Sequence, residues 1–143
     1  MNTILRKENI ILNCPKKAKK EVLEDVGRML YESGYTTEKY TEALMKKETI
    51  FNTAIGNDVA IPHGVEEMRG EILKSGIVVL VFPDGTDWDD GNVVKLVIGI
   101  AGVGNEHVEI LSNIACLCSD EESVAKITRM NVDEIYELFT TNQ

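Results

Sequence analysis

The chain has 143 residues, of which 43% are hydrophobic, and a net charge of −9. A chain of this length buries roughly two-thirds of the surface that it exposes when unfolded, so a single domain over residues 1–143 needs no disulfide or metal to form a core. The excess of acidic side chains argues against nucleic acid or an anionic membrane as the main partner, because both bind basic surfaces.

The cysteines and the apolar runs indicate the cellular compartment of the protein. Cys14, Cys116 and Cys118 make an odd number without the spacing of a metal site, which favours a reducing, cytoplasmic compartment. The first residues contain no long apolar stretch, so no secretion signal is expected. The longest uninterrupted apolar run, residues 77–82, is far too short to cross a bilayer. We therefore expect a cytoplasmic protein without direct membrane insertion.

The first third of the chain predicts a short strand and two helices. Residues 10–12 form an apolar run, and residues 16–33 carry apolar side chains at helical spacing. Gly34 is placed to end that helix, and Thr37 can cap a second one that extends to about Lys47. The connection between the helices is short, so they are expected to be neighbours.

Extended segments follow the second helix. Residues 50–55 and 58–61 are separated by the dipeptide Gly56-Asn57, which favours a tight turn. These segments are expected to form a hairpin that delivers His63 to one end of a sheet.

Two longer apolar runs predict the strongest strands. Residues 76–82 are apolar and rich in β-branched side chains, and Pro83 is expected to end this strand because proline cannot donate to a ladder. Residues 93–101 form the second run. Runs as apolar as these indicate a sheet that is covered on both faces.

The last third of the chain predicts helices. Residues 107–118 carry apolar side chains at helical spacing. Ser119-x-x-Glu122 and Asn131-x-x-Glu134 match the capping-box pattern that opens a helix. Strands mixed with helices on both sides predict a single-domain α/β sandwich, with a mixed β-sheet covered by helices on both faces.

One short segment points to chemistry. An apolar run enters Pro62-His63-Gly64, so the imidazole is held between a stiff residue and a permissive one. The unperturbed pKa of histidine lies near neutrality, so a neutral ring nitrogen of His63 is available as a nucleophile. For the tripeptide alone, a structural histidine in a tight turn is the alternative interpretation.

A longer pattern surrounds His63. It starts at Glu48, crosses six residues to Ile55-Gly56, and crosses two more to the run Val-Ala-Ile-Pro-His-Gly that ends at Gly64. This pattern resembles the phosphohistidine signature of the EIIA components of the sugar phosphotransferase system, fructose/mannitol type. The segment 95–111, which contains Gly-Asn-Glu-His, resembles the mannitol-type members.

The resemblance covers nearly the whole chain and implies a phosphotransferase component. It implies that His63 accepts a phosphoryl group from the phosphocarrier protein HPr, with attack through Nε2, and gives it to a cysteine of the EIIB component of the mannitol permease. No cofactor is expected, because the intermediate is a covalent phosphohistidine. Mannitol or a related polyol is the sugar that the resemblance indicates.

Three further residues are candidates for the site. His107, at the expected start of a helix where free amides favour anions, matches a histidine that lies beside the phosphorylated one. Lys47 stands where mannitol-type members usually carry arginine, and lysine keeps the charge but loses the planar fork that grips two oxygens. Thr53 matches a recurring threonine whose hydroxyl could bond to the site. The alternatives are solvent-exposed roles for His107 and Lys47 and a structural role for Thr53.

Two other functions stay open. A regulatory EIIA of the nitrogen-related kind would signal through its phosphorylation state and would not feed sugar uptake. A non-catalytic module would use the pocket at His63 for an anion or a metal, although no short-spaced ligand pair supports a zinc site.

Overall fold

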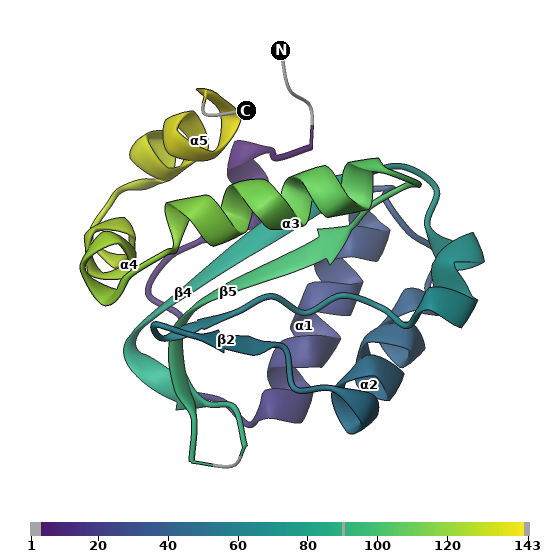
Figure 1. The fold of residues 1–143 in the computed structure, drawn as a ribbon, viewed down its shortest axis with the longest axis horizontal. Helices are drawn as coiled ribbons and strands as arrows, with labels where there is room; N and C mark the ends of the chain where they lie inside the picture. Colours follow the sequence, from purple (N-terminus) through teal and green to yellow (C-terminus); the bar gives the residue numbers. More distant parts are fainter. Residues whose placement is uncertain (1–3, 90, 142–143) are drawn as a thin grey trace.

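The computed structural model describes residues 4–89 and 91–141. A five-stranded sheet in the order β1-β4-β5-β3-β2 lies between two layers of helices (Figure 1). The strands are β1 (Ile10–Ile11), β2 (Ala54–Gly56), β3 (Val59–Ala60), β4 (Gly76–Asp87) and β5 (Val93–Ala101). The helices are α1 (Lys19–Glu32), α2 (Tyr40–Ile50), α3 (Glu106–Leu117), α4 (Glu121–Thr128) and α5 (Val132–Thr141), with 3₁₀ turns at Lys7–Asn9 and Glu66–Glu71.

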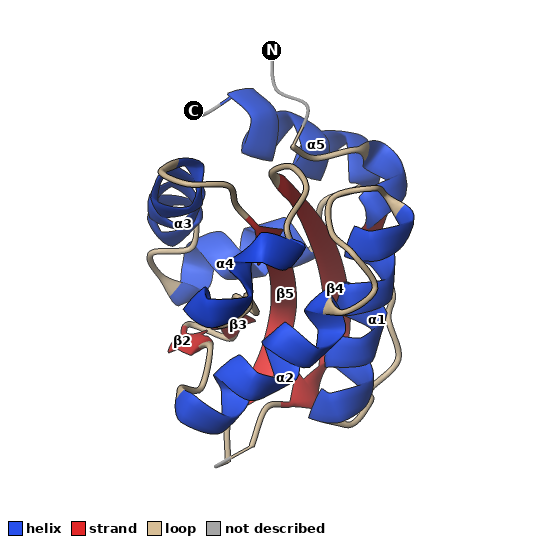
Figure 2. Ribbon diagram, turned by 90° about the vertical axis from the view of Figure 1, so that its right-hand side faces the viewer, coloured by secondary structure: helices blue, strands red, loops and turns tan. Residues whose placement is uncertain are grey.

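The sheet is mixed, as the sequence predicted. Strand β1 runs parallel to β4, and β3 runs parallel to β5. The β4–β5 and β2–β3 pairs are antiparallel. Figure 2 shows α1 and α2 on one side of the sheet and α3 on the other. The predicted α/β class, with helices on both faces, is therefore confirmed.

Alternation along the long central strands separates two hydrophobic cores. Val78 and Leu80 of β4 pack in the core that contains α1 and α2, whereas Ile77 and Val79 pack in the core that contains α3, α4 and α5. All four side chains are at most 4% exposed. Because successive residues of a strand point to opposite faces, both faces of β4 have to be apolar. This explains the continuous hydrophobic run in the sequence.

The predicted end of the strand at Pro83 is wrong. Strand β4 continues to Asp87, and its pairing with β5 shifts register between Val81 and Thr86. Pro83 lies within this irregular stretch and is exposed. An irregular stretch tolerates a residue that cannot donate to the ladder, so β4 continues past the proline and pairs with β5 again at Thr86.

The predicted hairpin is confirmed, but its bounds differ. Helix α2 continues through Ile50, and the N–H of Phe51 still donates to the Lys47 carbonyl at 2.8 Å, so the first strand begins only at Ala54. The turn residues are Asn57 and Asp58, with φ of 55° and 67°. Asparagine and aspartate tolerate this left-handed region, which places the turn one position later than predicted.

The helix caps of the last third were predicted in part. The reciprocal capping box of α5 is confirmed, because the Asn131 side chain accepts from the Glu134 N–H at 2.8 Å and Glu134 accepts from the Asn131 N–H at 2.9 Å. The cap predicted at Ser119 is wrong. The carboxylate of Asp120 accepts from the Ser123 N–H at 2.7 Å and opens α4 one residue later.

Candidate functional site

His63 lies just beyond the end of β3, beside the central strand β5. Its backbone forms a bridge with Ile100, whose N–H donates to the Pro62 carbonyl at 2.9 Å. The ring nitrogen Nδ1 lies 2.8 Å from the carbonyl oxygen of Ile61. A carbonyl oxygen can only accept, so in the neutral ring Nδ1 carries the hydrogen and Nε2 keeps its lone pair. The ring is partly exposed, which leaves it accessible to a docking protein.

Tyr40 holds the backbone that follows His63. Its hydroxyl accepts from the Gly64 N–H at 2.9 Å and donates to the Ile100 carbonyl at 3.0 Å. The side chain is 1% exposed, and burial raises the pKa of Tyr40 to about 12, so the hydroxyl stays protonated. A Cβ at Gly64 would lie 2.7 Å from the Tyr40 ring. Glycine is therefore required here for close packing.

His107 reaches the same place from the first turn of α3. The ring centroids of His63 and His107 are 5.3 Å apart, and the ring planes are tilted by 56°. A Cβ at Gly102 would lie 2.5 Å from the Cα of His107. This glycine therefore lets α3 begin directly against the end of β5. The two histidines, far apart in the chain, are brought together as predicted, and the phosphoryl contact of His107 stays a prediction.

Both imidazoles are biased toward their neutral forms. Burial is the main cause that lowers the pKa of His63 below its ordinary value of 6.5, and the charges of His107 and Lys47 add to it. The hydrogen bond to Ile61 and the charge of Glu48 act in the opposite direction. A neutral ring is the form that can act as a nucleophile.

The pKa of His107 is lowered for a related reason. Burial is again the main cause, the charge of Glu66 raises the pKa, and the charge of Lys47 lowers it. Lys47 thus acts on both rings, from the last turn of α2, where its Nζ lies 5.5 Å from the centroid of the Phe51 ring. The charge of Lys47 therefore lowers the pKa of both histidines, and its contact with a phosphoryl group stays a prediction.

Thr53 is fully buried behind the histidine. Its hydroxyl donates to the carboxylate of Glu48, and its carbonyl accepts from the Ile61 N–H at 3.0 Å. The hydroxyl hydrogen already has a partner in this arrangement. The predicted bond from Thr53 to a phosphoryl group stays a prediction, whereas its observed link to the site runs through the backbone of Ile61.

A cavity of about 510 Å³ adjoins His107. It lies between the 3₁₀ turn Glu66–Glu71 and the start of α3, and its lining includes Gly64 and Arg69. Val103 and Val108, which also line it, are 44% and 62% exposed. Exposed apolar side chains beside a partly exposed histidine are suited to a protein that docks there.

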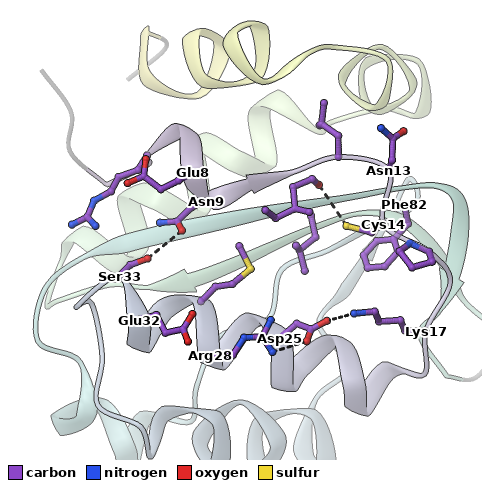
Figure 3. A pocket seen from close by; sticks show the side chains of 16 residues that line it. Glu8, Asn9, Asn13, Cys14, Lys17, Asp25, Arg28, Glu32, Ser33 and Phe82 are labelled. Atoms are coloured by element: carbon purple, nitrogen blue, oxygen red, sulfur yellow. Dashed lines mark hydrogen bonds and ion pairs between the residues drawn. The ribbon is translucent and has the colours of Figure 1, made fainter.

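A cavity of about 570 Å³ lies elsewhere, between β1 and α1 (Figure 3). Asp25 accepts from both Lys17 and Arg28 there, at 2.5 and 3.0 Å. The charges of the whole lining balance, with three basic side chains against three acidic ones. Burial raises the pKa of the half-buried Cys14 and keeps its thiol protonated. These features do not favour phosphoryl chemistry in this cavity.

The part of the chain that the structure describes holds no group of three or more His, Cys, Asp and Glu side chains that could bind a metal ion. Within the same residues, no helix is both long and apolar enough to span a bilayer.

Comparison with known proteins identifies the family. Residues 3–142 match the family described as "Phosphoenolpyruvate-dependent sugar phosphotransferase system, EIIA 2". The chain belongs to this EIIA family. It is 43% identical over 131 residues to the mannitol-specific phosphotransferase enzyme IIA component of Bacillus subtilis, with 92% of each chain covered. The protein of the same name from Staphylococcus aureus (strain N315) is 39% identical over 140 residues, covering 97% of this chain and 96% of that protein.

Solved structures of EIIA proteins share this fold. The crystal structure of IIA mannitol from Escherichia coli aligns with a TM-score of 0.85 and 30% identity, covering 94% of this chain and 98% of that one. The complex of enzyme IIAMTL with phosphorylated enzyme IIBMTL from Escherichia coli aligns with a TM-score of 0.86 and 30% identity, covering 96% and 99%. The nitrogen regulatory protein IIA-Ntr from Neisseria meningitidis aligns with a TM-score of 0.81 and 25% identity, covering 96% of this chain and 97% of that one.

Sequence reasoning missed two supports of this EIIA site. Tyr40 lies within the segment predicted as the second helix and was not expected in the site, although a tyrosine on a buried face needs a partner for its hydroxyl. Lys19 was not predicted to take part at all. Its Nζ forms an ion pair with Glu48 at 2.8 Å, from the first turn of α1. No local pattern indicates this contact, because it joins two helices.

Proposed function

We propose that this EIIA protein is a phosphocarrier that accepts a phosphoryl group on His63 from phosphorylated HPr and passes it to a cysteine of an EIIB component. The observation that supports this most is the geometry of the His63 ring. Its Nδ1 is occupied by the Ile61 carbonyl, which leaves Nε2 as the nucleophile, and the ring of His107 lies 5.3 Å away. Such an arrangement orients one nitrogen toward incoming phosphorus.

The transfer needs little chemistry from the protein beyond placement and charge. The Nε2 lone pair forms the bond to phosphorus while the bond between phosphorus and the donor atom of HPr breaks, and that electron pair leaves with HPr. The phosphoryl group adds about two negative charges. Lys47 and His107 offset part of this charge, Lys47 as a fixed cation and His107 through a ring N–H.

A second transfer of the same kind, with His63 now as the leaving group, delivers the phosphoryl group to EIIB. A cysteine thiolate of EIIB attacks phosphorus, the nitrogen–phosphorus bond breaks, and its electron pair returns to Nε2. The IIAMTL–IIBMTL complex of Escherichia coli, which this chain matches at a TM-score of 0.86, supports an EIIB component as a partner of this chain. We place this exchange in the cytoplasm, where HPr and EIIB are expected to alternate on one small surface.

Mannitol is the sugar that we propose. The curated relatives at 39–44% identity are named mannitol-specific, whereas the aligned nitrogen regulatory protein is 25% identical. This difference favours sugar uptake over regulation. Uptake of a related polyol would require the same phosphoryl relay, because the sugar is bound by other components.

The direct test is phosphorylation in a purified system. Incubation with HPr, its upstream kinase and labelled phosphoenolpyruvate should label the wild type with acid-labile, base-stable phosphate, and His63→Ala should stay unlabelled. The label should then move to a mannitol EIIB, and the gene should restore mannitol growth to a strain that lacks its own EIIA. Label retained in His63→Ala, or a phosphoprotein that cannot donate to EIIB, would contradict the proposal.

A further inference from the structure

A buried ion pair is connected to the proposed phosphorylation site through hydrogen bonds. The Nζ of Lys19 at the start of α1 is 2.8 Å from the Glu48 carboxylate near the end of α2, and their side chains are 9% and 6% exposed. Asp89 adds a contact to Lys19 at 3.3 Å, and the Trp88 ring centroid lies 5.4 Å from its Nζ. Burying a charged pair costs free energy, so such a pair is weak evidence for stability alone.

The Glu48 carboxylate is bound on both oxygens. One oxygen pairs with Lys19 and accepts from the Thr53 backbone N–H at 3.2 Å. The other accepts from the Thr53 hydroxyl. Thr53 is 0% exposed, so its position is determined by these two bonds and by the chain on either side. The carboxylate thus orients one complete residue, both its side chain and its peptide.

Thr53 in turn orients the peptide that holds the histidine. Its carbonyl accepts from the Ile61 N–H at 3.0 Å, and the Ile61 carbonyl lies 2.8 Å from Nδ1 of His63. The contacts therefore form a continuous path from Glu48 through Thr53 and Ile61 to the ring. A change at Glu48 would alter the direction of the Ile61 carbonyl, and this carbonyl decides which ring nitrogen keeps its lone pair.

We propose that Glu48 is a positioning residue for phosphoryl transfer: paired with Lys19, it holds Thr53 so that the Ile61 carbonyl selects the His63 tautomer with a free Nε2. Glu48 touches neither the ring nor the phosphoryl group and orients the ring along this path, apart from the effect of its charge on the pKa of His63. The kinetic part of this inference rests on the proposed function, whereas the tautomer can be observed without phosphate.

Removing the charge from Glu48 should disturb the ring and leave docking intact. Glu48→Gln keeps the side-chain length, but its amide nitrogen cannot accept, so Thr53 loses one of two acceptors. We expect kcat for phosphoryl acceptance from phospho-HPr to fall about 10- to 100-fold, as a small misplacement of the reacting atom does. The KM for phospho-HPr should stay within about twofold, because Glu48 is 6% exposed and cannot contact a docked partner.

The tautomer supplies a second readout that a purely structural role would not change. In ¹⁵N-labelled unphosphorylated protein at pH 8, the wild-type His63 should show a protonated Nδ1 and an unprotonated Nε2. Glu48→Gln should show a mixture of the two tautomers. Glu42→Gln is the matched control, because Glu42 lies on the same helix in an exposed pair with Lys46. It removes the same charge and should change neither readout.

A second variant tests the path itself. Thr53→Val removes the hydroxyl that donates to Glu48 and keeps the side-chain shape and the carbonyl. If both residues act along one path, Glu48→Gln combined with Thr53→Val should lower kcat no further than Glu48→Gln alone. Fluorescence of Trp88, the single tryptophan, shows whether Glu48→Gln is folded and unfolds cooperatively. If it does not, Thr53→Val replaces it as the test variant. It should then lower kcat and mix the tautomers by itself.

The outcomes separate this inference from the proposed function. A single wild-type-like tautomer in the folded variants, an unchanged kcat, or losses that add in the double variant would overturn the role of Glu48. Failure of the wild type to accept phosphate would overturn the proposed function. The tautomer measurement would still decide whether Glu48 positions His63.

Discussion

The rings of His63 and His107 lie with their centroids 5.3 Å apart, one at the end of a strand and the other in the first turn of a helix. Both rings are partly exposed on one side of the molecule, and Lys47 lies close enough to lower the pKa of each. This arrangement leads us to expect that a phosphoryl group on His63 contacts the ring of His107 and the ammonium group of Lys47. The predictions below test how each neighbour contributes.

His107→Ala should separate acceptance of phosphate from its donation. The variant keeps His63 and its bond to Ile61, so labelling from phospho-HPr should still reach completion. Transfer to EIIB should be slower, by roughly 10-fold or more, because one hydrogen-bond donor to the transferring group is lost. Rapid-mixing kinetics with purified EIIB measure this step. Equal transfer rates in the variant and the wild type would leave His107 with a structural role.

Lys47→Gln should raise the pKa of both histidines. Burial and the Lys47 charge both lower these pKa values below the ordinary 6.5, so removing the cation makes each ring easier to protonate. NMR titration of the ring carbon-bound protons measures both midpoints. Lys46→Gln is the control, because Lys46 is exposed and pairs with Glu42 at 3.5 Å. Equal shifts in both variants would contradict a specific role for Lys47.

The rate of phosphoryl acceptance should follow the same titration. Only neutral His63 attacks phosphorus, so the rate should fall as the pH drops through its lowered pKa, below 6.5. In Lys47→Gln the raised pKa should move this fall to higher pH. Pre-steady-state labelling between pH 5 and 8, with HPr phosphorylated beforehand, measures it. A Lys47→Gln profile displaced toward lower pH would reverse the sign expected here.

Gly102→Ala should misplace His107 while leaving the histidine itself in the sequence. The added Cβ would lie 2.5 Å from the Cα of His107 and 3.0 Å from its backbone nitrogen, so the start of α3 has to move. Transfer to EIIB should slow at least as much as in His107→Ala, and stability should fall by about 1–3 kcal/mol. Gly70→Ala is the control, because a Cβ there meets nothing within 4 Å. Crystal structures of both variants would show whether α3 moved.

Tyr40→Phe should destabilise the protein and loosen the histidine loop. The change leaves the Gly64 N–H and the Ile100 carbonyl without their hydroxyl partner in a buried place. We expect a loss of about 1–3 kcal/mol in the free energy of unfolding by urea. Tyr31→Phe, at a side chain that is 45% exposed, should cost little and serves as the control. Equal stability of the two variants would show that the Tyr40 hydroxyl contributes nothing.

Local sequence determined the elements around His63. The second apolar run predicted β5 with its correct bounds, Val93–Ala101, because a strand that is buried on both faces needs a continuous apolar run. The reciprocal cap of α5 could also be predicted from sequence, because Asn131 and Glu134 lie one turn apart and their contact is local. Pro62 and Gly64 also indicated that His63 lies just beyond the end of a strand, as the structure shows.

Tertiary structure decided which side chains support that histidine. The ring of His107, the hydroxyl of Tyr40 and the ammonium group of Lys19 reach the site from three different helices, and their contacts depend on how these helices pack on the sheet. The strand that contains Pro83 was mispredicted for the same reason. Whether β4 can contain a proline depends on how it pairs with β5, which shifts register there. Residue order dictates local backbone preference, but contacts between distant segments follow from the shared burial of apolar faces, which no short pattern encodes.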